Sequence, residues 1–316
     1  MTSNTLNEYA LHVFRYQANH NIIYKEYLKA LGVNPQKVIG IDNIPFLPID
    51  FYKNHKVVSG VWEEELIFQS SGTTGQSTSK NYIKSLEGYI DNSEFIFRQF
   101  YGDPGDYILL ALLPSYLEQG NSSLVAMVKN LIEKTNHKES GFFLYDFEKL
   151  HKVIVSQYGR DRKLLLWGVS YALLDFSEQF PVPIPDAIVM ETGGMKGRKK
   201  EMIRTELHAL LKERFAIKNV HSEYGMTELA SQGYALNQGR FQVPPWMKIL
   251  IRDINDPFSY VENGRAGAIN VVDLANWDTC SFIETGDIGI KFEENSFEIM
   301  GRLDNSEIRG CNLLSL

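Results

Sequence analysis

Uninterrupted apolar runs, each followed by a segment of helical periodicity, constrain the fold of this chain most strongly. Residues 107–113 form an unbroken apolar run, and residues 164–167 and 187–190 repeat the pattern. Between the runs, apolar side chains recur at helical spacing, as over residues 86–100 and 124–132. A strand that is apolar on both faces must be covered on both faces, and helices supply that cover in α/β folds. The sequence therefore predicts an α/β fold with a mostly parallel sheet flanked by helices.

The segments on either side of this core have different patterns. Residues 6–31 carry apolar side chains at helical spacing, and prolines make residues 44–48 extended. After about residue 239, short strand candidates alternate with Asn, Asp, Gly and Pro turns. We therefore expect an N-terminal helical and extended segment at residues 1–65, an α/β core at residues 66–238 and a β-rich subdomain at residues 239–316.

The composition excludes several classes of protein. The 316 residues are 44% hydrophobic and 22% charged, which is ordinary for a globular protein. The net charge is -7, from 32 Lys and Arg against 39 Asp and Glu, and this argues against a nucleic-acid-binding surface. No apolar stretch is long enough for a membrane span or a signal peptide. Two cysteines, Cys280 and Cys311, cannot form a disulfide framework, so we expect a cytoplasmic protein.

A polar loop rich in glycine and hydroxyl groups is expected at residues 70–80, directly after the apolar residues 66–68. Glycine lets successive backbone N–H groups point toward one centre, and such a nest of donors suits a phosphate. The hydroxyl groups and Lys80 add donors and a positive charge, although the same composition also fits a flexible linker. The loop is not a P-loop, because Ser77 replaces the second glycine of that motif and Asn81 follows the lysine.

The segment 223–228 follows a probable strand that ends near His221. In open α/β sheets ligands bind beyond the carboxyl ends of the strands. Here Tyr224 could stack on a purine, Thr227 could donate to a phosphate and Glu228 could hold Mg²⁺. The alternative is structural, since tyrosine also packs in cores and Thr and Glu also begin helices.

Two further segments have the same ambiguity. Gly193 and Gly194 follow a predicted strand and open a helix, which permits close backbone approach to an anion or merely starts a solvated helix. Asp287 and Arg302 could hydrogen-bond ribose hydroxyls or complete turns between strands. Cys311, beside a basic residue, could be a reactive thiolate or an inert residue near the end of the chain.

The order of these motifs resembles the adenylate-forming superfamily of acyl-CoA ligases and their relatives. The series is Ser-Ser-Gly-Thr-Thr-Gly with Lys80, Gly193-Gly194, Tyr224-Gly225-Met226-Thr227-Glu228, Thr285-Gly286-Asp287 and Gly301-Arg302-Leu303-Asp304. Within the superfamily, residues 113–118, 191–194, 223–229 and 309–311 look like the acyl-protein synthetases. These are the fatty-acid-activating subunits of the reductase complex that supplies aldehyde to bacterial luciferase.

The resemblance implies a fold, a reaction and a set of site residues. The fold would be the large N-terminal domain of adenylate-forming enzymes with a nucleotide- and acyl-binding core, without a separate lid domain after Asp304. A fatty acid would react with MgATP to give acyl-AMP, and Cys311 would then take the acyl group as a thioester. Family roles place the triphosphate on Ser70, Ser71, Gly72, Thr73, Thr74, Gly75 and Lys80, adenine on Gly193, Gly194 and Tyr224, phosphate on Thr227, Mg²⁺ on Glu228, and ribose on Asp287 and Arg302.

Other readings of the resemblance stay open. The substrate would be a fatty acid or another carboxylic acid, and an acyl-accepting reductase or carrier subunit would be a partner. The chain could instead be an acyl- or aryl-CoA ligase similar to phenylacetate-CoA ligase, or a non-catalytic module that holds ATP or an adenylate. In the acyl-protein synthetase reading too, the source of the lid chemistry stays open between Lys80, a partner subunit and nothing.

Overall fold

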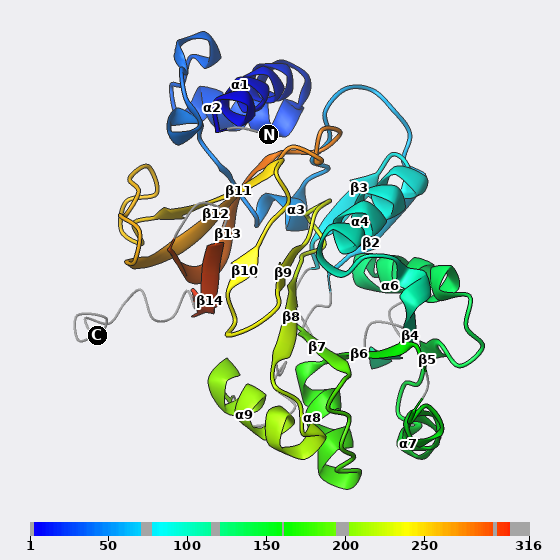
Figure 1. Cartoon of the computed structure of the whole chain (residues 1–316). Helices are drawn as coiled ribbons and strands as arrows, with labels where there is room; N and C mark the ends of the chain where they lie inside the picture. Colours follow the sequence, from blue (N-terminus) through cyan, green and yellow to red (C-terminus); the bar gives the residue numbers. More distant parts are fainter. Residues whose placement is uncertain are drawn as a thin grey trace. The chain divides into compact units, whose positions relative to one another are not determined.

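The computed structural model describes residues 3–70, 78–114, 121–159, 161–193, 202–292 and 296–303 of the chain. The chain divides into two compact units. One consists of Met1–Glu63 with Gln242–Leu316, and the other of Glu64–Phe241 (Figure 1). Residues 1–63 and 242–316, which are far apart in the sequence, therefore belong to one unit.

The Glu64–Phe241 unit is built on a sheet with strand order β9-β8-β7-β6-β4-β5 (Figure 1). The strands are β4 (Tyr107–Leu112), β5 (Gly141–Phe142), β6 (Lys163–Val169), β7 (Ile188–Thr192), β8 (Val220–Tyr224) and β9 (Gly233–Ala235). Strands β4 to β8 pair in parallel, and β9 runs antiparallel to β8. Every residue of β4 is buried. The prediction of a mostly parallel sheet buried on both faces is thus confirmed.

Helices and a separate hairpin complete this unit. They are α4 (Leu86–Tyr101), η3 (Pro104–Asp106), α6 (Ser123–Thr135), α7 (Phe147–Ser156), α8 (Ser170–Gln179) and α9 (Arg204–Phe215). The N-cap of α6 is Ser122, whose side chain accepts a hydrogen bond from Val125 N. The hairpin consists of β2 (Leu66–Gln69) and β3 (Lys80–Ile83), which pair antiparallel. Helix α4 packs on α6, and α8 packs on α9.

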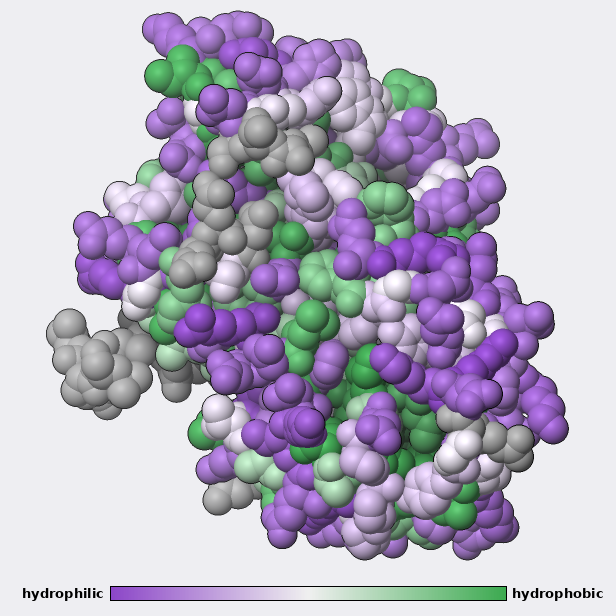
Figure 2. Space-filling view, in the orientation of Figure 1, coloured by the Kyte–Doolittle hydropathy of each residue, from purple (hydrophilic) through white to green (hydrophobic). Residues whose placement is uncertain are grey.

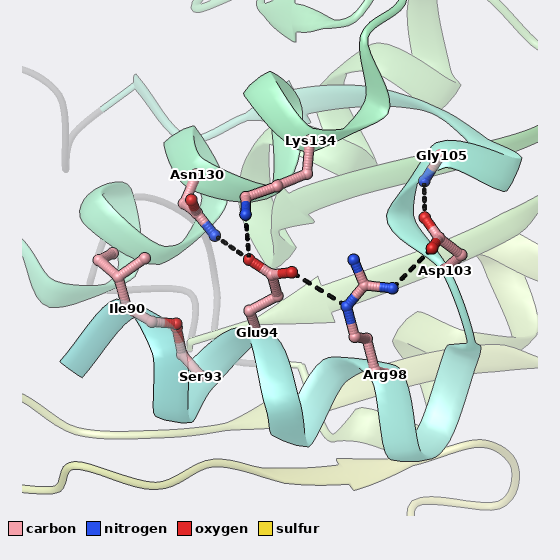
Figure 3. A network of polar contacts seen from close by, with 8 residues as sticks. All are labelled: Ile90, Ser93, Glu94, Arg98, Asp103, Gly105, Asn130 and Lys134. Carbon is pink, nitrogen blue, oxygen red and sulfur yellow. Dashed lines mark hydrogen bonds and ion pairs between the residues drawn. The ribbon is translucent and has the colours of Figure 1, made fainter. Parts of the chain in front are cut away.

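A polar network joins α4 to α6 (Figure 3). Glu94 accepts hydrogen bonds from Asn130 Nδ2 at 3.0 Å and Arg98 Nε at 2.9 Å, and Lys134 Nζ lies 3.2 Å from its carboxylate. Arg98 also donates to Asp103 at 2.7 Å. Partial burial raises the pKa of Glu94, but the three hydrogen-bond donors outweigh burial and hold it below its ordinary value. The carboxylate therefore links the two helices in its charged form.

The other unit has an antiparallel sheet of order β11-β12-β13-β14, with β1 parallel to β13. Its strands are β1 (Leu47–Pro48), β11 (Met247–Arg252), β12 (Ala266–Asp273), β13 (Phe282–Lys291) and β14 (Ser296–Arg302), and β10 (Phe241–Gln242) lies at the boundary of the units. Its helices are α1 (Ser3–His20), α2 (Ile22–Ala30), η1 (Pro35–Lys37), η2 (Ile41–Asn43) and α3 (Phe51–Asn54). The strands expected after residue 239 are present as β11 to β14, and they share one unit with residues 1–63.

Polar side chains attach α1 to this sheet. The buried Gln17 donates to the carbonyl oxygens of Asn276 and Trp277 at 3.0 Å and accepts from Ser281 N at 2.9 Å. The single helical stretch expected over residues 6–31 is interrupted at Asn21, whose side chain accepts from Tyr24 N and starts α2. An Asn at that position favours a cap over a continuous helix.

The surface seen in Figure 2 is mostly hydrophilic, with small hydrophobic areas between the polar residues. Among the described residues, no helix has the length and apolar character needed to cross a bilayer.

Candidate functional site

The hairpin β2–β3 carries the two ends of the predicted phosphate loop. Ser70 N donates to Ser79 O at 3.0 Å, and Ser79 N donates to Ser70 Oγ at 2.9 Å, so these serines close the base of the loop. Lys80 begins β3 and is exposed. The loop residues Ser71, Gly72, Thr73, Thr74 and Gly75 lie outside the described residues.

The hairpin is fixed to the segment that follows β8. Asn81, only 2% exposed, donates from Nδ2 to Thr227 O at 2.9 Å. This bond joins residues 146 positions apart in the sequence. It places the base of the predicted phosphate loop next to Thr227, whose predicted contact with phosphate comes from a different motif.

A charged network lies at the carboxyl end of β7. Glu191, 3% exposed, pairs with Arg204 Nε at 3.0 Å and with His208 Nε2 at 3.5 Å, both from α9. Ser170 Oγ, at the start of α8, lies 3.2 Å from Glu191 Oε2 and 2.9 Å from Gly193 O. Burial raises the pKa of Glu191, but His208 and the charge of Arg204 more than offset this, so the group stays ionised. Gly193, with φ +66°, is thereby held in a left-handed conformation that suits glycine.

A second carboxylate at the neighbouring strand end behaves differently. Thr192 and Glu223 are direct partners in the register of β7 and β8, and Thr192 Oγ1 donates to Glu223 Oε2. The pKa of Glu223 is raised to about 7. Burial is the main cause and the charge of Glu191 adds to it, while the hydrogen bond from Thr192 acts in the opposite direction. Near neutral pH Glu223 therefore exists in both its acid and its carboxylate forms.

Tyr224, the last residue of β8, is 7% exposed. Its ring contacts Phe241 edge to face, with centroids 6.0 Å apart. The Arg204 guanidinium lies over the same Phe241 ring at 5.2 Å. Its family role, stacking on adenine, stays a prediction.

Glu228 is 4% exposed and Thr227 is half-buried. Among the described residues, no group of three His, Cys, Asp or Glu side chains could hold a metal ion. A single carboxylate still fits Mg²⁺, because this ion commonly binds one or two carboxylates together with water and the phosphates of a nucleotide. The donor set present thus suits an ion that arrives with ATP.

Asp287 and Arg302 lie opposite each other on β13 and β14. Arg302 Nε is 3.2 Å from Asp287 Oδ1, and the arginine side chain is 76% exposed while the aspartate is 12% exposed. The segment containing Asp287 is not a turn, as considered from its composition, but the middle of the continuous strand β13. The pair offers both an acceptor and donors for hydroxyl groups.

The two cysteines have different positions. Cys280 is fully buried, and burial raises the pKa of its thiol to about 12. A buried thiol with a raised pKa is a poor nucleophile. Cys311 and Gly194 lie outside the described residues.

Sequence reasoning missed several contributors to this region. Asn81, Thr192 and Glu223 were not singled out, nor were Ser170 and Arg204 of the neighbouring helices. A signal was present for Glu223, since it directly follows the predicted strand near His221, and a carboxylate that is buried there needs a partner. Its partner could not be read without the order of the strands.

Comparison with solved structures identifies the fold. The structure is similar to an open conformation of 2-hydroxyisobutyryl-CoA ligase (HCL) in complex with 2-HIB-AMP and CoA, with a TM-score of 0.71 and 13% identity over 96% of this chain and 70% of that chain. It is also similar to HCL in the thioesterification state, with a TM-score of 0.67 and 14% identity over 96% of this chain and 68% of that chain. ATP-bound MatB from Rhodopseudomonas palustris has a TM-score of 0.55 and 15% identity over 75% of this chain and 47% of that chain.

The chain therefore spans about half the length of MatB and about two thirds of HCL. No family model matches the sequence, and no curated protein matches it significantly. At these identities the likeness concerns the fold alone, and it confirms the predicted α/β fold class with a mostly parallel sheet flanked by helices.

Proposed function

We propose that this protein is an ATP-dependent acid-activating enzyme that converts a fatty acid to acyl-AMP and then transfers the acyl group to its own Cys311. The observation that carries the first step is the hydrogen bond from Asn81 to Thr227. The bond joins β3, which directly follows the predicted phosphate loop, to the segment at residues 223–228, for which phosphate contact is predicted from a different motif. The fold of adenylate-forming ligases supports the same step.

In the activation step the residues mainly position the reactants and neutralise charge. Backbone N–H groups of the loop, Lys80 and Thr227 would hold phosphate oxygens, and Glu228 would hold Mg²⁺. When bound, the metal would screen the negative charge that develops on the phosphates. A carboxylate oxygen of the fatty acid then forms a bond to the α-phosphorus, while the bond from that phosphorus to pyrophosphate breaks.

In the transfer step the acyl carbon forms a bond to sulfur and loses its bond to AMP. The thiolate is the attacking species, and its proton is released to solvent. Cys280 is unsuited to this role because its thiol is buried and its pKa is raised to about 12. Of the two cysteines in the sequence, this leaves Cys311. The family resemblance assigns the acylated cysteine to the same position.

Acid-dependent exchange of radiolabelled pyrophosphate into ATP tests the activation step alone. We expect exchange that requires Mg²⁺ and a fatty acid, measured across a series of chain lengths. ATP binding without exchange with any acid would contradict the enzymatic proposal and favour a non-catalytic module.

Labelling with radioactive fatty acid and MgATP tests the transfer step. The label should be released by neutral hydroxylamine, as a thioester is, and should disappear in Cys311→Ala. The matched control is Cys280→Ala, which should keep the label because the buried thiol does not accept it. Exchange without protein labelling, together with rapid turnover on added coenzyme A in Cys311→Ala, would instead identify a CoA ligase.

A further inference from the structure

The carboxyl ends of β7 and β8 are bridged by the side chains of Thr192 and Glu223, which the proposed reaction does not use. Both side chains are buried, with residues 3% and 8% exposed, and they face each other across adjacent parallel strands. Thr192 Oγ1 donates to Glu223 Oε2. The residue after Thr192 is Gly193, and the residue after Glu223 is Tyr224, so the bridge lies one position before two predicted nucleotide contacts.

The second oxygen of Glu223 supports the segment that leaves β8. A Cβ atom at Gly225 would collide with Glu223 Oε1, so the carboxyl group lies directly against the backbone there. Glycine at this position leaves room for the carboxyl group. Glu223 therefore contacts the end of β7 with one oxygen and the start of the Gly225–Glu228 segment with the other.

The surroundings of Glu223 disfavour a charge. Among the described residues, no lysine or arginine pairs with it, and a buried carboxylate without a cation is costly. The ionisable groups that interact with it electrostatically are Tyr101 on α4, Tyr234 on β9 and Glu191, which points to the other face of β7. His221, two residues earlier on β8, shares a hydrogen bond of 3.2 Å between its Nδ1 and the hydroxyl group of Tyr101. Burial lowers the pKa of His221 to about 4, so it is neutral at pH 7.

We propose that Glu223 is a positioning residue that acts in its uncharged acid form, holding the Gly193 backbone and the Gly225–Glu228 segment in the arrangement that receives the triphosphate. This inference rests on the proposed function, because the segments it positions are the proposed nucleotide contacts. Loss of the Glu223 proton would add a buried negative charge next to the binding region of an anionic substrate. The pKa of about 7 places that loss within the range of ordinary assays.

The first test is the pH dependence of KM for ATP in pyrophosphate exchange. In the wild type KM should be constant below about pH 7 and rise severalfold by pH 8.5. The side chain in Glu223→Gln cannot lose a proton. In this variant the ratio of KM at pH 8.5 to KM at pH 6 should be smaller than in the wild type, by the factor by which the wild-type KM rises. An unchanged profile in this variant would overturn the inference.

A second pair of variants tests the bridge. Thr192→Val keeps the shape of the side chain but removes the donor, and should raise KM for ATP about tenfold with a smaller effect on kcat. Thr192→Ser restores the hydroxyl and should recover most of the loss. If serine and valine behave alike, the hydrogen bond does not position the strand ends.

A measurement without substrate separates this inference from the proposed function. The pKa of Glu223 is higher in the folded protein than in the unfolded chain. Between about pH 4.3 and pH 7 the folded protein therefore keeps the Glu223 proton, whereas the unfolded chain has lost it. Relative to Glu223→Gln, wild-type Tm should therefore fall over that interval and stay level above it. If pyrophosphate exchange is absent but the Tm difference between wild type and Glu223→Gln changes with pH as expected, only the proposed function is refuted. If this Tm difference is independent of pH, the role of Glu223 is refuted.

Discussion

Replacing Asn81 by alanine should lower both stability and activity, and the structure gives the size of each effect. Asn81 is buried, and its bond to the Thr227 carbonyl is 2.9 Å long. Loss of one net hydrogen bond costs about 1 kcal/mol, and leaving a part-buried carbonyl without its partner adds about 1–2 kcal/mol. We therefore expect the free energy of unfolding to fall by about 2–3 kcal/mol, measured by urea denaturation.

The effect on activity should exceed what lost stability explains. A displacement of about 1 Å at a reacting group can reduce a rate about 100-fold. Because Asn81 sets the position of the hairpin relative to Thr227, we expect kcat/KM for ATP in pyrophosphate exchange to fall by at least about tenfold, or 1.4 kcal/mol. The assay is run well below the unfolding transition of the variant, so that the folded enzyme is compared.

Asn92 provides the matched control for this experiment. Its Nδ2 donates to Ala230 O at 2.8 Å, which is the same kind of bond in the same unit, but it comes from α4 and not from the hairpin. Asn92→Ala should lose a similar free energy of unfolding and keep most of the exchange activity. Equal losses of activity in Asn81→Ala and Asn92→Ala would refute the reasoning, because the Asn81 bond would then contribute stability only.

Four further substitutions test the fold. Glu94→Gln should cost about 1 kcal/mol at pH 7 and little below pH 4 in urea denaturation, because a lowered pKa gives stability that is lost as pH falls. Burial lowers the pKa of His221 to about 4, so the unfolded chain binds a proton at this residue between pH 6.5 and pH 4 while the folded protein does not. Tm should therefore fall as the pH is lowered from 6.5 to 4, and His221→Asn should make this fall smaller. Gly267→Ala should destabilise by more than about 3 kcal/mol, since its Cβ would meet the Arg252 backbone and lie 2.7 Å from the neighbouring side chain. Gly286→Ala, with no atom within 4 Å of the added Cβ, should cost under about 1 kcal/mol, and equal losses would contradict the steric argument.

The α/β core could be predicted because its signal is local. A strand such as β4 that is buried on both faces must be apolar at every position, and the run at residues 107–113 has no other common explanation at that length. The cap at Ser122 is equally local, because one side chain and the N–H three residues later suffice. Such features depend on a few neighbouring residues, so the sequence contains what is needed to find them.

The strand β13 shows where local signals mislead. Its residues 282–284 and 288–292 look like separate strands, because Thr285-Gly286-Asp287 has the composition of a turn. In the structure the segment is a bulge inside one strand: Ala268 and Asn270 of β12 pair with Ile288 and Glu284, so residues 285–287 lie opposite the single residue Ile269. Thr285 Oγ1 donates to Ile269 O at 2.8 Å and Leu303 N donates to Gly286 O at 2.7 Å, so contacts with distant residues hold the bulge within the strand.

The contacts that organise the candidate site are of a third kind, which no reading of local sequence could supply. Thr192 and Glu223 are 31 residues apart, and Asn81 and Thr227 are 146 apart. Periodicity predicts that β7 and β8 are strands, but it predicts neither that they are neighbours nor which residues share a register. A slip of one residue would turn Glu223 to the opposite face of the sheet. The bridge between the strand ends therefore depends on strand order and register together. A resemblance to a known fold can suggest both, but the structure is needed to define them.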